Sequence, residues 1–186
     1  MKIIAAVTGA SGAVYARRCL EILCRAPQVE RIALIVSDRA AEVLEYEGER
    51  LPASPKIVRY DNADMFSPAA SGSARFDAMI IVPASMGSVG RIASGVSLSL
   101  IERAADVMLK ERRPLVCVVR ETPYSLVHLR NMTALAEAGA VILPASPSFY
   151  SHPRTVDDLT ATVVDRAVEH LGVERQHYEF EGRADK

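Results

Sequence analysis

The feature that most constrains the fold of this chain is the alternation of short apolar runs with amphipathic stretches. Apolar runs occur at residues 2–7, 31–37, 56–59, 78–83, 115–119 and 140–143. The third is short and lies in an irregular region over 51–76. Most of these runs are apolar almost throughout instead of alternating with polar residues, which is typical of strands buried on both faces of a parallel sheet.

The stretches between the runs have helical periodicity. They predict helices over 13–25, 38–47, 86–94, 98–112, 123–138 and 156–171. Thr122 followed by Pro123 predicts an N-cap and first helical residue, and Thr155 with Asp158 resembles a capping box. Repeated strand–helix units predict an α/β fold: a single Rossmann-like or flavodoxin-like domain with a mostly parallel sheet and helices on both faces.

Composition excludes several classes of protein. The 186 residues carry a formal net charge of −1, without a basic block, so nothing indicates nucleic acid or a membrane surface as partner. No apolar run approaches the roughly 18 residues of a membrane span. The three cysteines form no CxxC pair and read as reduced thiols. We therefore expect a soluble, cytoplasmic protein.

Polar residues follow the predicted strands at the points where they end. The first such segment is VTGASGA (7–13), in which Gly9 and Gly12 permit a tight turn at the start of a helix. Its backbone N–H groups are expected to face an anion, such as the phosphate of a nucleotide. Further polar segments follow at 37–38, 83–88, 120–123 and 144–150. In a parallel sheet these carboxyl ends meet at one edge, where ligands bind.

A nicotinamide dehydrogenase fits this edge poorly. Asp38 stands where an acid that binds NAD would, but the third glycine of GxGxxG is missing after TGASG. The chain also has no Tyr followed four residues later by Lys. Asp38 then needs no role in binding NAD, because an acidic side chain in the first turn of a helix is stabilised by the helix dipole.

Two long segments in the second half resemble a known family. Residues 102–132 (ERAADVMLKERRPLVCVVRETPYSLVHLRNM) and 139–153 (GAVILPASPSFYSHP) are similar to the UbiX-type flavin prenyltransferases, and TGASGA, SGS (71–73) and PASMGS (83–88) fit the same family in the same order. The resemblance implies a flavoprotein-like, FMN-binding catalytic domain over 1–172, with 173–186 as a C-terminal tail.

The resemblance also implies an activity. Members of this family transfer a dimethylallyl group from dimethylallyl phosphate to N5 and C6 of reduced FMN, and the prenylated FMN serves UbiD-type decarboxylases. A homo-oligomer, often a dodecamer built from trimers, is expected. The only adjacent acidic pair that could resemble a DDxxD motif is Asp157–Asp158, so a site without metal, using basic side chains, is the consistent interpretation.

Individual roles follow from the resemblance. The implied FMN-binding residues are Gly9, Ala10, Ser11, Ser37, Ser85, Met86, Gly87, Ser88 and Arg120. Tyr150 and Arg166 match the residues that hold the prenyl phosphate. The implied catalytic residues are Ser11, Glu47, Arg103, Lys110 and Glu121, some of them supplied by a neighbouring subunit. Ser11 and Glu47 would form the relay that removes a proton from flavin C6. By pattern alone, Lys110 and Arg166 could equally be exposed charges on helices.

The chain departs from the family pattern at two places. Leu98–Ser99 replaces a polar pair that precedes the ERAAD helix in many members, and Ala84 stands where Cys is frequent. A flavin-dependent cysteine decarboxylase of the same fold is one alternative, but such enzymes use an early His and a PxMNxxM segment, and the four histidines here lie at 128 or later. A flavin-binding protein without turnover is the other alternative.

Overall fold

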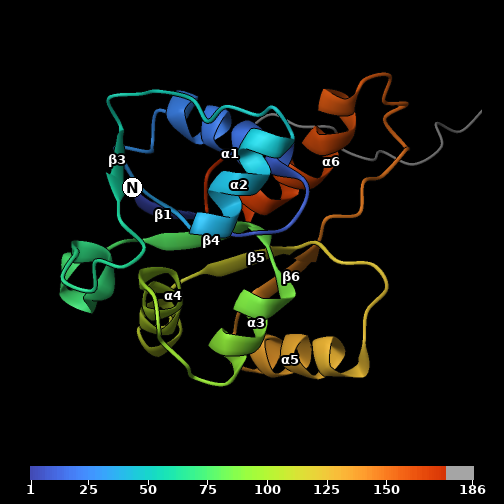
Figure 1. Ribbon diagram of the computed structural model, residues 1–186. Helices are drawn as coiled ribbons and strands as arrows, with labels where there is room; N and C mark the ends of the chain where they lie inside the picture. Colours follow the sequence, from blue (N-terminus) through green and yellow to red (C-terminus); the bar gives the residue numbers. More distant parts are fainter. Residues whose placement is uncertain (175–186) are drawn as a thin grey trace, which may run out of the picture.

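Six parallel strands form one sheet in residues 1–174, the part of the chain that the computed structural model describes (Figure 1). The strands are β1 (Lys2–Val7), β2 (Arg31–Val36), β3 (Ile57–Tyr60), β4 (Ala78–Ala84), β5 (Leu115–Val119) and β6 (Val141–Pro144). Their order is β3-β2-β1-β4-β5-β6, and every neighbouring pair is parallel. The order reverses between β1 and β4, which is where ligands bind in sheets of this kind. The predicted fold class is confirmed.

Helices cover both faces of the sheet (Figure 1). They are α1 (Ala13–Arg25), α2 (Asp38–Tyr46), α3 (Met86–Ala93), α4 (Leu100–Lys110), α5 (Leu126–Glu137) and α6 (Val156–Glu169), with short 3-10 turns η1 (Pro68–Ala70) and η2 (Gly72–Ala74). In Figure 1, α1, α2 and α6 lie on one side of the strands and α3, α4 and α5 on the other.

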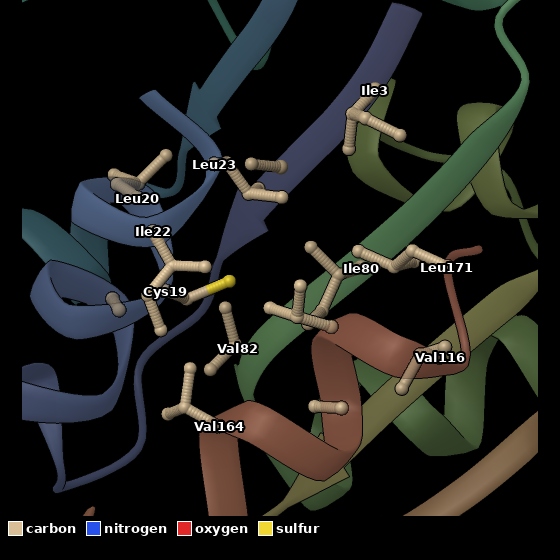
Figure 2. Packing of buried hydrophobic residues seen from close by; sticks show 14 of the residues in the cluster. Ile3, Cys19, Leu20, Ile22, Leu23, Ile80, Val82, Val116, Val164 and Leu171 are labelled. Atoms are coloured by element: carbon tan, nitrogen blue, oxygen red, sulfur yellow. The ribbon is translucent and has the colours of Figure 1, made fainter. Parts of the chain in front are cut away.

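Alternate strand residues fill two apolar cores. Ile3 and Ile80 pack with α1 and α6 on one face, as Figure 2 shows, where Leu23 and Val164 reach the same cluster. Ile4 and its neighbours pack on the opposite face with α3 and α4. Full burial of such a side chain stabilises the fold by about 1.5–3 kcal/mol. These two cores hold the carboxyl edge of the sheet rigid.

The predicted start of the fifth helix is wrong. α5 begins at Leu126, and Ser125 is its N-cap: the Ser125 hydroxyl accepts a hydrogen bond from His128 N (3.2 Å), and His128 Nδ1 accepts one from Ser125 N (3.2 Å). The Thr122–Pro123 peptide bond is cis and belongs to the loop after β5. These two reciprocal hydrogen bonds form a capping box at Ser125, so the helix starts there and not at the predicted N-cap, Thr122.

Other helix ends agree more closely with the sequence. Thr155 caps α6 as expected, because its hydroxyl accepts from Asp158 N (3.0 Å) while the Asp158 carboxylate accepts from Thr155 N (3.0 Å). α4 is shorter than its predicted 98–112. Val173, assigned to the tail by the sequence, is buried in the core beside α1 and α6. The rest of the predicted tail, 175–186, lies outside the described residues.

Candidate active site

Three helices begin around one cavity at the carboxyl edge of the sheet. The cavity has a volume of about 300 Å³, and the N-cap residues of α2, α3 and α4, which are Ser37, Ser85 and Ser99, all line it. Each helix N-terminus carries a partial positive charge and N–H groups without partners inside the helix. The start of α4 is already capped, because Leu100 N and Ile101 N donate to Asn62 and Ser99 N donates to Glu102. The starts of α2 and α3 are the two that favour an anionic ligand.

Five of the residues predicted to bind FMN line this cavity: Gly9, Ser37, Ser85, Gly87 and Ser88. Gly9 has a steric reason to be glycine, because a Cβ there would lie 2.5 Å from Arg39 Cβ on α2. Any side chain at position 9 would push α2 away from the turn that follows β1. The structure therefore brings together parts of three segments that are far apart in the sequence.

The remaining predicted FMN residues lie beside the cavity or beneath it. Ala10 and Met86 are largely buried, and Met86 packs into the core on the α3 side of the sheet. Ser11 is exposed in the turn after β1. Arg120 directly follows β5 and is discussed below with Glu47.

Thr8 fixes the position of the α3 N-terminus and was missed from the sequence. Its buried hydroxyl donates to Pro83 O (2.8 Å) and accepts from Ser85 N (2.8 Å). It thereby joins the end of β1 to the end of β4 across the point where the strand order reverses. Only the strand order makes this contact possible, so no local pattern could have predicted it.

Two N–H groups of the turn after β1, those of Gly12 and Ala13, do not face a phosphate as predicted. Gly12 N donates to both oxygens of the Glu47 carboxylate (3.0 and 3.1 Å), and Ala13 N donates to one of them (2.7 Å). Gly12, with φ +104°, adopts a left-handed conformation that a side chain would strain. A carboxylate of the protein itself therefore occupies the N-terminus of α1, and the anion site suggested by the fold lies at the starts of α2 and α3.

The surroundings of Glu47 keep it ionised. Burial raises the pKa of this carboxyl, but the Ser11 hydroxyl, the N–H groups of Gly12 and Ala13 and the charge of Arg120 together lower it below its usual value. The structure thus places Ser11 and Arg120 close to Glu47. Tyr15 lies nearby. Burial raises its pKa, and the positive charge of Arg120 lowers it by a smaller amount.

A second polar region lies beyond β5 and β6. Arg120 and Glu121 line a cavity of about 440 Å³ with Ser146, and Glu121 accepts a hydrogen bond from Thr122 N (3.0 Å). Arg166 lines another cavity, of about 430 Å³, between α6 and the loop that precedes it, and forms an ion pair with Glu169. Tyr150 lies in that loop with 68% of its surface exposed.

Arg103 and Lys110 are not brought to this region within one chain. Arg103 on α4 donates to Ala70 O (3.2 Å) and pairs with Asp106 (2.6 Å), whereas Lys110 pairs with Glu111 (2.6 Å). Lys110 precedes β5 and Glu121 follows it, so the two lie toward opposite ends of that strand.

Glu102 and Arg91 are further site residues that the sequence did not reveal. Glu102 lines the cavity, is only 3% exposed, and accepts hydrogen bonds from Leu98 N (2.8 Å) and Ser99 N (2.9 Å). Its other oxygen pairs with Arg91 Nε. The segment SLIE (99–102) has the S-x-x-E spacing of a helix start, which could have indicated Glu102. Arg91 had no such signal.

Within residues 1–174, no group of three or more His, Cys, Asp or Glu side chains is arranged to hold a metal ion. Among the helices of the same part of the chain, none has the length and apolar character needed to cross a membrane.

Comparison with known proteins identifies the family. The Flavoprotein family model matches residues 1–168. A flavin prenyltransferase UbiX from Methanocaldococcus jannaschii is 42% identical over 180 residues, which cover 94% of this chain and 95% of that protein. The chain belongs to the UbiX-type flavin prenyltransferase family.

Solved structures of this UbiX-type family agree with the fold. A dodecameric FMN-dependent UbiX-like decarboxylase from Escherichia coli O157:H7 superposes with a TM-score of 0.90 at 39% identity, covering 98% of this chain and 100% of that chain. The protein AnUbiX (PadA1), solved in complex with FMN and dimethylallyl pyrophosphate, gives a TM-score of 0.86 at 40% identity, covering 97% and 98%.

Proposed function

We propose that this protein is a flavin prenyltransferase that transfers a dimethylallyl group from dimethylallyl phosphate to N5 and C6 of reduced FMN. The observation that carries this proposal is identity of about 40% with UbiX flavin prenyltransferases over more than nine-tenths of the chain. The catalytic domain covers the expected residues 1–172 together with Val173, which is buried in its core.

FMN fits the cavity at the starts of α2, α3 and α4. The hydroxyls of Ser37 and Ser88 and the N–H groups at the starts of α2 and α3 form a donor set suited to a phosphate, and Ser85 lies beside them with its hydroxyl donating to Ser88 Oγ (3.1 Å). Gly9, Ala10, Ser11, Met86, Gly87 and Arg120 complete the proposed FMN site. When bound and reduced, the flavin supplies the nucleophilic ring atoms that accept the prenyl group.

Basic side chains neutralise the departing phosphate. A phosphate monoester carries a charge of about −1.5 to −2 near neutral pH and leaves poorly unless that charge is stabilised as the C–O bond breaks. Arg166 and Tyr150 bind the prenyl phosphate, and Arg103 and Lys110 add positive charge. Glu121 provides the acidic group on the opposite side of this second site. No metal is required by this arrangement.

Glu47 and Ser11 handle the proton that leaves flavin C6. The Glu47 carboxylate is ionised at neutral pH and can accept a proton, and its lowered pKa makes it a weaker base than an ordinary glutamate. The Ser11 hydroxyl, hydrogen-bonded to this carboxylate, relays the proton from the ring.

A homo-oligomer completes the site. Arg103 and Lys110 lie away from Glu121 and Arg166 in one chain, so we assign them to the site of a neighbouring subunit. Leu126, Val127 and Leu129 on α5 are 59%, 63% and 48% exposed, as expected of surface that an oligomer covers. A dodecamer like that of the Escherichia coli relative, a cytoplasmic location and a UbiD-type decarboxylase as recipient of the product complete the proposal.

The decisive experiment is a single-turnover reaction. The protein is incubated anaerobically with reduced FMN and dimethylallyl phosphate, in parallel with the diphosphate, and the flavin is weighed by mass spectrometry. We expect a mass gain of one prenyl group, unaffected by excess EDTA. Unmodified FMN in a sample that binds both ligands would instead favour a flavin-binding protein without turnover, and CO₂ release from a cysteine peptide would favour the decarboxylase.

A matched variant tests the second phosphate site. Arg166→Ala removes a charge-assisted contact typically worth about 1.5–3 kcal/mol, or roughly 10- to 150-fold in affinity for the prenyl donor. FMN affinity should hardly change, because FMN lies at the starts of α2, α3 and α4. Tyr150→Phe should act in the same direction but more mildly. Loss of FMN from Arg166→Ala, with the prenyl donor still bound, would show that α6 belongs to the other site.

A further inference from the structure

The guanidinium of Arg91 lies over the first turn of α3, at the wall of the proposed FMN cavity. Its Nε pairs with Glu102, its Nη2 is 3.3 Å from the Ser88 hydroxyl, and its Nη1 is 3.4 Å from the position that a Cβ on Gly87 would take. Gly87, Ser88 and Arg91 all line the cavity. A side chain at position 87 would compete with the guanidinium for this space.

Glu102 holds the guanidinium in this place. The carboxylate of Glu102 is 3% exposed, and its second oxygen is fixed by the N–H groups of Leu98 and Ser99 at 2.8 and 2.9 Å. Because the carboxylate cannot move without breaking these bonds, it fixes the plane of its arginine partner. Arg91 itself is 45% exposed, and a guanidinium carries more N–H donors than these two contacts use. The remaining donors are available to a ligand.

The charges that line the cavity favour an anion close to Arg91. Glu102 neutralises part of the arginine charge, and Asp38 is a second acid at the wall. Against these stand Arg91, the positive ends of α2 and α3, and Arg39, which pairs with Glu42 at the exposed surface. Ser88, which contacts Arg91, lies in the first turn of α3, where N–H groups have no partner within the helix.

We propose that Arg91 binds the phosphate of FMN and makes the site selective for the phosphorylated flavin over riboflavin, with Glu102 as its positioning residue. This inference rests on the proposed function, since it takes FMN to be the ligand of the cavity. The competing explanation is that Arg91 only neutralises the buried Glu102 and joins α3 to α4. The two explanations differ in what they predict for a flavin without a phosphate.

The test compares FMN with riboflavin in the full-length apoprotein. Dissociation constants for both are measured by quenching of flavin fluorescence in the wild type, Arg91→Met and Arg91→Lys. We expect Arg91→Met to weaken FMN binding by about 10- to 100-fold while riboflavin binding changes by less than about twofold. Arg91→Lys should lie between, because an ammonium keeps the charge but not the planar fork.

Loss of Arg91 could destabilise the protein, because it leaves the buried charge of Glu102 without a partner. A double variant removes both charges and keeps the test valid. Arg91→Met is then combined with Glu102→Gln, and Glu102→Gln alone is the control that retains the arginine. The selectivity for FMN should be reduced but still present in Glu102→Gln, which keeps the guanidinium and loses the carboxylate that positions it. It should disappear in the double variant. Equal weakening of both flavins, or no weakening of either, would overturn the role of Arg91 while leaving the proposed function intact. A wild-type protein that binds neither flavin would overturn both.

Discussion

At the scale of single residues, the carboxylate of Glu47 couples the chemistry of the site to the stability of α1. Its pKa is lowered, because hydrogen bonds from Ser11, Gly12 and Ala13 and the charge of Arg120 outweigh the effect of burial. A carboxyl group whose pKa is lower in the folded than in the unfolded protein stabilises the fold. This stabilisation is complete at a pH above the pKa of the unfolded state. The stabilisation is lost as the pH falls through the pKa of the folded state.

Glu47→Gln should therefore change how stability depends on pH. We expect the variant to be about 1 kcal/mol less stable than the wild type at pH 7, as for loss of a charged group at a helix N-terminus. The difference should shrink as the pH falls below 4.5, the ordinary pKa of the group, because protonation removes the same charge from the wild type. Urea denaturation at several pH values measures it. Glu45→Gln, at an exposed position on α2, is the control, and a difference for Glu47→Gln that stays constant with pH would contradict the role given to its charge.

Sequence resemblance predicted Glu47 but not the groups that hold it. The predicted contact with a phosphate was wrong for the N–H groups of Gly12 and Ala13, because both already donate to this carboxylate, which lies 35 and 34 residues further along the chain. Arg91 and Glu102 were missed for a similar reason. Their contact depends on how α3 and α4 pack, and only the S-x-x-E spacing of residues 99–102 leaves a trace in the sequence.

At the scale of elements, the start of α5 shows how two local signals can compete. Thr122 followed by Pro123 and Ser125 followed by His128 both fit the start of a helix, and the structure uses the second. We expect Ser125→Ala to lower the free energy of unfolding by about 1 kcal/mol, the usual value of an N-cap. Thr122→Ala, in the preceding loop, should change it by less than half as much. Urea denaturation measures the free energy of unfolding of both variants. A larger loss for Thr122→Ala than for Ser125→Ala would support the helix start that the sequence predicted.

Arg17 joins three elements that the sequence does not place together. From α1 it reaches Glu21 (3.1 Å), Glu49 after α2 (2.7 Å) and Asp157 at the start of α6 (2.8 Å). Its Glu49 contact lies two residues from Glu47, so it also helps to fix the loop that carries the proposed base.

Replacement of Arg17 should be costly and coupled to its partners. Arg17→Met should destabilise the protein by about 1–2 kcal/mol, because a partly buried network of charge-assisted bonds is lost. Adding Glu49→Gln should cost less than the sum of the two single changes. Arg39→Met, which breaks an exposed pair with Glu42, is the matched control and should stay within about 0.5 kcal/mol. A double-mutant cycle measured by urea denaturation tests this coupling. If the two single changes in free energy of unfolding simply add, Arg17 and Glu49 are not energetically coupled.

At the scale of the whole molecule, the position of the site follows from the strand order. The apolar runs predicted a parallel sheet, and every expected strand is present. The order β3-β2-β1-β4-β5-β6 could not be read from periodicity, since all central strands share the same apolar pattern. That order places β1 beside β4 and so brings Gly9 and Ser85 to one cavity. It also leaves Lys110 and Glu121 toward opposite ends of β5, which points to a site completed by a second copy of the chain.

Mixed oligomers test this shared site directly. Lys110→Ala and Glu121→Gln should each be nearly inactive alone, because every site in either homo-oligomer lacks one essential group. When the two variants are dissociated, mixed in equal amounts and reassembled, a neighbour with intact Lys110 meets a subunit with intact Glu121 in about a quarter of the sites. Prenylated FMN, measured by mass spectrometry, should then reach about a quarter of the wild-type yield per subunit in the same time. Mixing without dissociation is the control and should restore nothing. If the reassembled mixture stays as inactive as its parents while wild type treated identically recovers, Lys110 and Glu121 must serve the same subunit's site.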